Sequence, residues 1–320
     1  MSEIKPSEIK KSMLSVDDIA TLMPTRPQRS NKSTFGRVVA VCGCHGMSGA
    51  AYLAGLAAYR VGCGLVEIVT PEDNRIILQT LLPEAILTCY SAEAPDNSRI
   101  AAAVSHADAV IVGCGLGTGA ASREVLETVL AALRSPAVID ADALNILATN
   151  RNLWAMVPEG VIITPHPGEM SRLTEISIPE ILSAPIDIAS ALAHHHNIVC
   201  VLKDHNSIIT DGQSYYINGF GNSGMSTAGS GDVLAGIIGG LLAQRKNTVM
   251  NVSDAQHIAA SSNCYETHTS LSTATLGVLL HSLSGDAAAR ELSEYSVMAT
   301  DIIKALPGIL KQYTGIIPAW

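Results

Sequence analysis

The glycine-rich segment Gly219–Asp232 carries the strongest chemical signal in the sequence. It reads Gly-Phe-Gly-Asn-Ser-Gly-Met-Ser-Thr-Ala-Gly-Ser-Gly-Asp and leads directly into the apolar stretch Val233–Ala243. Glycines let a backbone take positive φ angles and approach a ligand closely, and the unpaired N–H groups of a first helical turn attract phosphate. The segment predicts a phosphate site where a helix opens at Gly231, with Asp232 as a general base. A capping carboxylate is the plainer alternative for Asp232, and the long glycine-rich loop before it argues against that alternative.

A second signal is the stretch Thr164–Glu169, which reads Thr-Pro-His-Pro-Gly-Glu and follows a short apolar run. Two prolines restrict the backbone on both sides of His166. A turn with a solvent-facing histidine would rarely need such restriction, so we expect His166 to contact a ligand.

Two carboxylates stand just beyond another apolar run, in Asp140-Ala-Asp142. One of them could cap the following helix, and the other could face a site at the end of the strand. The three histidines 194–196, by contrast, are expected to form a solvated helix end where positive charge suits the helix dipole. We assign them no metal.

The loop Gly113–Gly119 superficially matches a dinucleotide-binding fingerprint between a strand and a helix. That fingerprint needs an acidic residue about 20 positions further along the chain. Asp140 stands 27 positions after Gly113. Rossmann-type binding of NAD is therefore disfavoured.

Short apolar runs alternate with helical segments along most of the chain. Strands are expected at 38–42, 65–70, 109–112, 137–139, 161–164, 198–202, 207–210 and 214–217, and helices at 50–61, 71–82, 120–133, 231–243, 274–290 and 296–306. This alternation predicts an α/β fold with a mostly parallel sheet, helices on both faces and ligands beyond the carboxyl ends of the strands. The short connections among the last three strands predict antiparallel pairing at one edge. We expect a short helix or arm over residues 1–34 and one domain over residues 35–320.

Composition agrees with a buried sheet, because 48% of the residues are hydrophobic and 15% are charged. The formal net charge of −9 argues against nucleic acid and anionic membranes as partners. Seven cysteines form an odd set without C-x-x-C spacing, which predicts reduced thiols. The N-terminal residues lack the apolar segment of a secretory signal, and no apolar stretch is long enough to span a bilayer. A soluble, cytoplasmic protein is expected.

Several ordered motifs together resemble the ADP/ATP-dependent NAD(P)H-hydrate dehydratases, a branch of the ribokinase-like fold, over roughly residues 36–310. They are Gly36-Arg-Val-Val with Met47-Ser-Gly-Ala-Ala51, Gly113-Cys-Gly-Leu, Asp140-Ala-Asp-Ala-Leu, Thr164-Pro-His-Pro-Gly-Glu, Val201-Leu-Lys203, Gly221-Asn-Ser-Gly-Met with Gly229-Ser-Gly-Asp, and Leu280-His-Ser-Leu-Ser-Gly-Asp286. The resemblance implies a three-layer α/β/α sandwich. Because the family also occurs fused to an N-terminal epimerase domain, for which this chain has no room, we expect a stand-alone dehydratase.

The resemblance also implies an activity of the lyase class. Damaged NADH or NADPH carries a hydroxyl at C6 of the nicotinamide ring, and hydroxide leaves poorly. The enzyme would transfer phosphate from ADP or ATP to this hydroxyl, and the departure of phosphate would regenerate NAD(P)H. The nucleotide is then a co-substrate, Mg²⁺ is expected on its phosphates rather than in a protein cage, and a homo-oligomer, often a tetramer in the family, is expected.

Roles for individual residues follow from the same resemblance. Asp232 is the expected catalytic base. The hydrate pocket is expected to be lined by Ala50, Ala51, Gly115 and His166 together with Asp232. The nucleotide is expected to contact Lys203, Asp204, His205, Asn206, Ser207, Asn222, Gly229, Ser230 and Gly231.

Two features depart from the family pattern. Asp204-His205 follows the lysine of Leu202-Lys203, where the family usually has glycine and small residues, and a carboxylate beside phosphate would repel it. The polar stretch 245–273 is also longer than the usual connection, so we treat it as an insertion. Both leave the choice between ADP and ATP open. A ribokinase-like kinase of a small alcohol or vitamin precursor is the alternative enzyme, and a nucleotide-binding protein without activity is the non-catalytic alternative.

Overall fold

A single sheet organises the chain. The computed structural model describes residues 10–13, 15–245 and 270–314. The sheet has ten strands in the order β1-β10-β9-β8-β7-β6-β5-β2-β3-β4. The strands are β1 (Lys10–Met13), β2 (Arg37–Val41), β3 (Leu65–Pro71), β4 (Ile86–Tyr90), β5 (Ala109–Val112), β6 (Ala137–Ile139), β7 (Ile162–Ile163), β8 (Val199–Leu202), β9 (Ile208–Thr210) and β10 (Ser214–Ile217). All neighbouring strands pair in parallel except β8 with β9 and β9 with β10.

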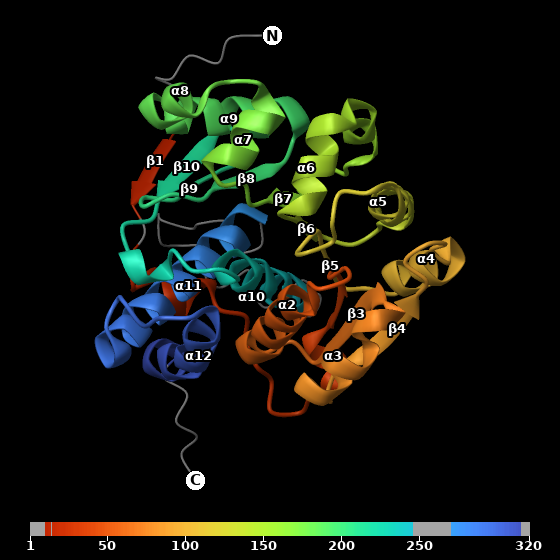
Figure 1. Cartoon of the computed structure of the whole chain (residues 1–320). Coiled ribbons are helices and arrows are strands. Elements are labelled where there is room, and N and C mark those ends of the chain that lie inside the picture. Colours follow the sequence, from red (N-terminus) through yellow and green to blue (C-terminus); the bar gives the residue numbers. More distant parts are fainter. Residues whose placement is uncertain (1–9, 14, 246–269, 315–320) are drawn as a thin grey trace.

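Helices cover both faces of this sheet (Figure 1). One face is covered mainly by α2 (Ser48–Val61), α3 (Arg75–Leu81), α10 (Ser230–Gln244), α11 (Ser270–Leu292) and α12 (Ala299–Thr314), with α1 (Asp18–Leu22) beside the last two. The other face is covered by α4 (Asn97–Ser105), α5 (Ala120–Ala132), α6 (Asp142–Thr149), α7 (Pro167–Thr174), α8 (Ile178–Ser183) and α9 (Pro185–His196). The three-layer α/β/α sandwich that the resemblance implies is confirmed.

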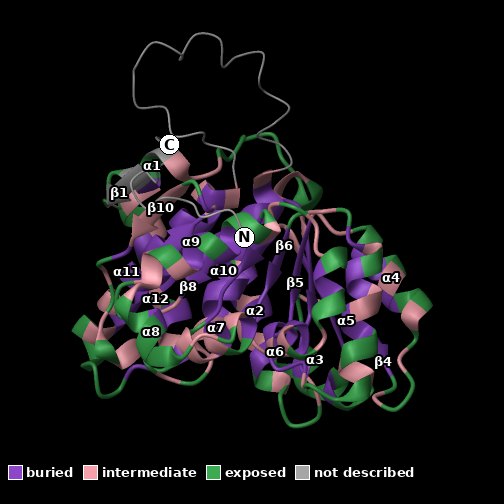
Figure 2. Ribbon diagram, turned by 90° about the horizontal axis from the view of Figure 1, so that it is seen from above, coloured by how far each residue is buried: buried purple, intermediate pink, exposed green. Residues whose placement is uncertain are grey.

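The two cores follow from the period-2 alternation of side chains along each strand. On β2, Val38 and Ala40 belong to the core on the α10 face, whereas Val39 and Val41 belong to the core on the α5 face. Both faces are apolar, as expected for parallel strands that helices cover on each side. Figure 2 shows the buried residues concentrated in the strands and on the inner sides of the helices.

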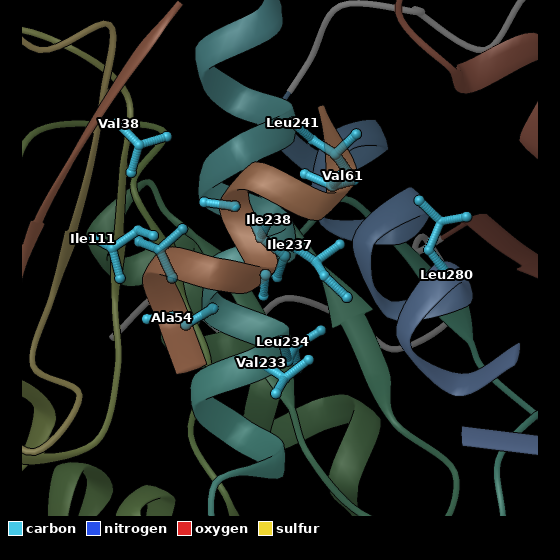
Figure 3. Packing of buried hydrophobic residues seen from close by; sticks show 14 of the residues in the cluster. Val38, Ala54, Val61, Ile111, Val233, Leu234, Ile237, Ile238, Leu241 and Leu280 are labelled. Carbon is cyan, nitrogen blue, oxygen red and sulfur yellow. The ribbon is translucent and has the colours of Figure 1, made fainter. Parts of the chain in front are cut away.

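Helix α10 is buried along all but its first three residues, because every residue from Val233 to Gln244 is buried. It lies against α2 and β5, where Ala54, Val61 and Ile111 meet its apolar side chains (Figure 3). Glycine permits this close approach: a Cβ on Gly236 would lie 2.3 Å from the carbonyl oxygen of Ala54. The glycines of α10 therefore bring its first turn close to the sheet.

Most of the expected elements are confirmed within a few residues, and β5, β6 and β10 match the expected bounds. The expectation missed β1, β4, α4, α7 and α8. The predicted antiparallel pairing of β8, β9 and β10 is confirmed, and β1, which was not expected, adds to β10 in parallel as the outer strand. The insertion predicted at 245–273 lies largely outside the described residues, and so does Cys264. The division into an arm (1–34) and a domain (35–320) stays a prediction.

A matched pair of glycine substitutions tests the close approach of α10. Gly236→Ala should destabilise the protein by roughly 1–3 kcal/mol, because the new methyl group overlaps backbone of α2. Gly308→Ala, on the exposed side of α12 where a Cβ meets nothing within 4 Å, should stabilise by about 1 kcal/mol through helix propensity. Thermal unfolding measures both, and equal shifts of the two variants would contradict the packing described here.

Candidate active site

A cavity of about 830 Å³ opens beyond the carboxyl ends of the central strands, beside the first turn of α10. Its wall includes ten residues that the sequence predicted as site residues: His166, Lys203, Asp204, His205, Ser207, Asn222, Gly229, Ser230, Gly231 and Asp232. These residues come from segments up to 66 positions apart, from His166 to Asp232. The fold thus brings together most of the predicted nucleotide contacts and the predicted base.

The first turn of α10 has the features of an anion site. Gly229 is the N-cap residue with φ of 87°, and no side chain caps the helix. The N–H of Ser230 donates to the carbonyl oxygen of Thr227 at 3.3 Å, so the N–H groups of Gly231 and Asp232 are the ones that remain for a ligand beside the cavity wall. Together with the positive end of the helix dipole they suit phosphate. The alternative that Asp232 caps this helix is wrong, because its side chain makes no capping hydrogen bond.

Asp232 shares its surroundings with a second carboxylate. One ligating atom each of Cys114, Asp140 and Asp232 lie within 4.8 Å of one another. Burial raises the pKa of Asp232, the charge of Asp140 raises it further, and the value reaches about 6. A carboxylate with this pKa is ionised near neutral pH, yet it binds a proton more readily than an ordinary aspartate.

Asp140 is almost completely enclosed within the site. It follows β6, it is 1% exposed, and its Oδ1 accepts hydrogen bonds from Thr164 Oγ1 at 2.6 Å and Lys203 Nζ at 2.8 Å. Thr164 follows β7 and Lys203 follows β8, the next strands in the sheet. Burial lowers the pKa of the Lys203 ammonium, but the charges of Asp140 and Glu169 outweigh this and raise it. Lys203 is therefore a charged ammonium that is paired with Asp140 in the ligand-free site.

The expectation for the Asp140–Asp142 pair was half right. Asp140 faces the site, as predicted for one of the two. Asp142 does not cap its helix; its Oδ2 accepts from the N–H of Gly117 at 2.8 Å and so holds the loop Gly113–Gly119. The backbone at Ala141 between them has φ 50° and ψ −118°, a conformation that side chains disfavour. This turn directs the two carboxylates to different places.

His166 lines the cavity and also caps a helix, a role that was not predicted from the sequence. It caps α7, because its Nδ1 accepts from the N–H of Gly168 at 3.0 Å, and its half-exposed ring lines the cavity. Burial lowers its pKa, and the charges of Lys203 and Arg172 lower it further. A neutral ring whose Nδ1 accepts must carry its proton on Nε2, so His166 can donate a hydrogen bond to a ligand.

The predicted residues Ala50, Ala51 and Gly115 cluster together but lie outside the lining of this cavity. Ala50 is 6% exposed and Ala51 is fully buried. A Cβ on Gly115 would lie 2.8 Å from the Cβ of Ala50, so the glycine permits its loop to reach the start of α2. Asn206 is exposed and also lies outside the lining. Their roles stay predictions.

His281 was missed as a site residue, although it belongs to one of the motifs that carry the resemblance. It lies on α11, 8% exposed, and its Nε2 is 3.3 Å from the hydroxyl oxygen of Ser230. Burial lowers its pKa to about 4, so the ring is neutral at physiological pH. A histidine in an apolar stretch of helix gives no sequence signal that separates it from core.

The expectation for the histidines at the end of α9 was wrong for His196. Its ring stacks on Trp154 with 3.9 Å between the centroids. Burial lowers its pKa to about 4, with further lowering by His195 and Arg151. His196 is therefore neutral and packed, and it does not add positive charge to the helix end.

The six described cysteines carry free thiols, five of them buried. Among the described residues, no helix combines the length and the apolar character needed to cross a bilayer.

Comparisons with known proteins agree with this site. A structure of a ribokinase-like superfamily protein from Enterococcus faecalis matches 99% of this chain and 100% of its own at 31% identity, with a TM-score of 0.79. The ADP/ATP-dependent NAD(P)H-hydrate dehydratase from Bacillus subtilis, co-crystallised with ATP/Mg²⁺, matches 94% of this chain and 98% of its own at 25% identity, with a TM-score of 0.76. Fold and site together define a ribokinase-like protein.

The family follows from the sequence comparisons. The family model described as NAD(P)H-hydrate dehydratase matches residues 38–308. The ADP-dependent (S)-NAD(P)H-hydrate dehydratase of Enterococcus faecalis is 32% identical over 94% of this chain and 93% of its own. The chain spans about half the length of bifunctional NAD(P)H-hydrate repair enzymes such as that of Coxiella burnetii, which is 36% identical over 89% of this chain and 52% of its own. This chain belongs to the NAD(P)H-hydrate dehydratase family.

The strained turn at Ala141 gives a stability test. Ala141→Gly should stabilise the protein by about 1 kcal/mol, because relief of roughly 1–3 kcal/mol of strain exceeds the entropy that glycine adds to the unfolded chain. Ala102→Gly, on the exposed side of α4, should instead destabilise by about 1 kcal/mol. Denaturant unfolding compares the two, and a loss of stability at both positions would show that Ala141 is not strained.

Proposed function

We propose that this protein dehydrates the hydrates of NADH and NADPH to NAD(P)H, with ADP or ATP as phosphate donor. The observation that carries the proposal is the position of Asp232: a carboxylate with a pKa of about 6 stands at an uncapped helix start, on the wall of a cavity large enough for nucleotide. This is what the deprotonation of an alcohol beside a polyphosphate requires. The names of the relatives support the same activity.

The reaction then proceeds in two steps. Asp232 accepts the proton of the C6 hydroxyl while the hydroxyl oxygen forms a bond to the terminal phosphorus of the nucleotide. The bond from that phosphorus to the departing AMP or ADP breaks at the same time. The first-turn N–H groups of α10 stabilise the charge that develops on the transferred group. The C6–O bond then breaks with the help of the ring nitrogen's electron pair, phosphate leaves, and loss of a proton from the adjacent ring carbon restores the dihydropyridine.

Mg²⁺ is proposed as the ion that accompanies the polyphosphate. The donor set of the site fits no dedicated cage for this ion: the one group of three candidate ligands found among the described residues includes a thiol, which Mg²⁺ avoids, and Asp140 is already paired with Lys203. Mg²⁺ would therefore be held mainly by phosphate oxygens and would neutralise part of their charge. The exposed Asp204 on the cavity wall is placed to approach such an ion.

The kinase alternative is less well supported, because the relatives that match nearly the whole chain are named hydrate dehydratases. A hydroxyethylthiazole kinase from Pyrococcus horikoshii shares the fold at 13% identity, and that likeness shows the fold alone. We further propose that the protein acts in the cytoplasm.

Asp232→Asn tests the proposed base. The amide keeps the shape of the side chain but cannot accept a proton, so turnover should fall by at least about 10²-fold. The assay incubates chemically hydrated NADH or NADPH with ADP or ATP and follows the return of absorbance near 340 nm.

Asp211→Asn serves as the matched control, because this carboxylate accepts hydrogen bonds within the β9–β10 turn and lies outside the cavity lining. It should turn over hydrate at the wild-type rate. Wild-type activity of the Asp232 variant would remove the base from the mechanism. A stable phosphorylated alcohol in place of NAD(P)H would favour a kinase, and nucleotide binding without turnover would favour a non-catalytic protein.

A homo-oligomer is also proposed, with a tetramer as the expected form. Four apolar side chains are exposed at the β4 edge of the sheet: Ile76 (71%), Ile77 (44%), Leu81 (49%) and Ile86 (43%). An apolar patch beside an open strand edge is typical of a surface that a second copy covers.

Ile76→Glu tests this surface. A charge in the patch should shift the protein to a smaller species, as measured by light scattering after size exclusion. Tyr295→Glu, at a fully exposed apolar residue outside the patch, should leave the species unchanged. A monomeric wild type, or an assembly indifferent to the Ile76 variant, would refute the assignment of this surface.

A further inference from the structure

Asp140 occupies the centre of the polar cluster, and the proposed reaction gives it no role. Its Oδ1 is engaged by the hydroxyl of Thr164 and the ammonium of Lys203, as described above. Because β6, β7 and β8 are adjacent and parallel, their next residues leave the sheet at the same edge and meet there. A hydroxyl and an ammonium that both donate to one oxygen stabilise a carboxylate anion.

The other oxygen of Asp140 points toward α10. Its Oδ2 lies 3.9 Å from the sulfur of Cys114, and a Cβ on Gly231 would lie 3.7 Å from the same oxygen. A carboxylate oxygen of Asp232 lies within 4.8 Å of an Asp140 oxygen. Two carboxylates at this distance raise each other's affinity for a proton.

We infer that Asp140 is a positioning residue for the base: its anchored carboxylate strengthens the proton affinity of Asp232 through like charge. This inference rests on the proposed function, because it concerns the base of that reaction. A general base is most effective when its proton affinity matches the working pH, and an ordinary aspartate is too weak for this. Asp140 supplies the increase without touching the substrate.

The groups around the two carboxylates explain why a proton bound by the pair resides on Asp232 rather than on Asp140. Asp140 has two donors on one oxygen, and Glu169 accepts the N–H of His166 at 2.8 Å and lies 3.8 Å from Lys203. Asp232 has weaker partners: a hydrogen bond from the thiol of Cys114 and the charge of Lys203 both lower its pKa, but by less than burial and the charge of Asp140 raise it.

The remaining neighbours add little charge. Asp142 also raises the pKa of Asp232, but more weakly, and its own carboxylate is turned to Gly117. His166 and His281 have lowered pKa values and bring no positive charge to the site at neutral pH. Asp140 is therefore the main charged influence on the base.

The test compares pH profiles of kcat/KM for hydrate turnover in the wild type, Asp140→Asn and Asp142→Asn. The wild type should lose activity as the pH falls through about 6, because the base becomes protonated there. In Asp140→Asn the acid limb should move down by at least about one pH unit, and the plateau should fall about tenfold because the base is weaker. Asp142→Asn should move the limb by much less. A role of Asp140 in folding alone would lower the plateau without moving the limb.

A second readout does not depend on turnover. Carbon-13 carboxyl resonances of aspartate are titrated in the ligand-free protein, with Asp232→Asn identifying the signal of the base. The pH midpoint of the Asp232 signal should fall in Asp140→Asn, because a negative charge is lost. It should rise in Lys203→Met, because the loss of the positive charge makes the carboxylate pair hold its first proton more tightly. Asp140→Ser removes the same charge and keeps a hydroxyl that can accept from Lys203, so it keeps the test decisive if Asp140→Asn does not fold.

The outcomes separate the two proposals. An unmoved acid limb in a folded Asp140→Asn, or an unmoved midpoint in the titration, overturns the inference while the dehydratase stands. Absence of wild-type turnover with either nucleotide at any pH overturns the proposed function, and the titration still decides whether Asp140 controls Asp232.

Discussion

The ion pair between Lys203 and Asp140 is the interaction on which the rest of the site depends. It joins residues 63 positions apart, and it forms because β6 and β8 end at the same edge with β7 between them. Thr164, at the end of β7, donates to the same oxygen. Removal of one partner would leave a charge in a nearly closed environment, which is costly. The sheet order thus determines where the partly buried ammonium of Lys203 lies, and with it the charge that Asp232 experiences.

The packing of α10 supplies the second half of the site. Val233–Gln244 is buried, and glycines at contact points such as Gly236 let the helix lie close to α2 and β5. The helix start is therefore held at a defined distance from Asp140 and Lys203, so that a Cβ on Gly231 would be 3.3 Å from the ammonium nitrogen. A mobile helix start could not keep a phosphate site and a base in register. Here the rigid core positions the reactive groups.

Most of the architecture was predictable because its signals are local. Strand β6 is a short apolar run between a proline and two carboxylates, and the glycine-rich loop before α10 has a composition that no core element shares. Strand β4 was missed because Ile86–Tyr90 lies at the edge of the sheet, where only part of the strand is buried. Its sequence, Ile-Leu-Thr-Cys-Tyr, therefore lacks the continuous apolar run of a central strand. Pairing between side chains was not predictable in the same way. Asp140 was expected only to face a site, and its partners became known from strand order; His281 gave no local signal at all.

The charges of the site resolve an apparent conflict. A site for polyphosphate is expected to be rich in cations, yet this one sets Asp140, Glu169 and Asp232 against a single lysine that is already paired. Backbone N–H groups and the dipole of α10 can hold phosphate without a mobile cation. A free lysine or arginine beside Asp232 would bind phosphate as well, but it would lower the proton affinity of the base that must act next to it. The backbone dipoles of α10 can bind phosphate, and the negative charge of Asp140 raises the proton affinity of Asp232, so neither function weakens the other.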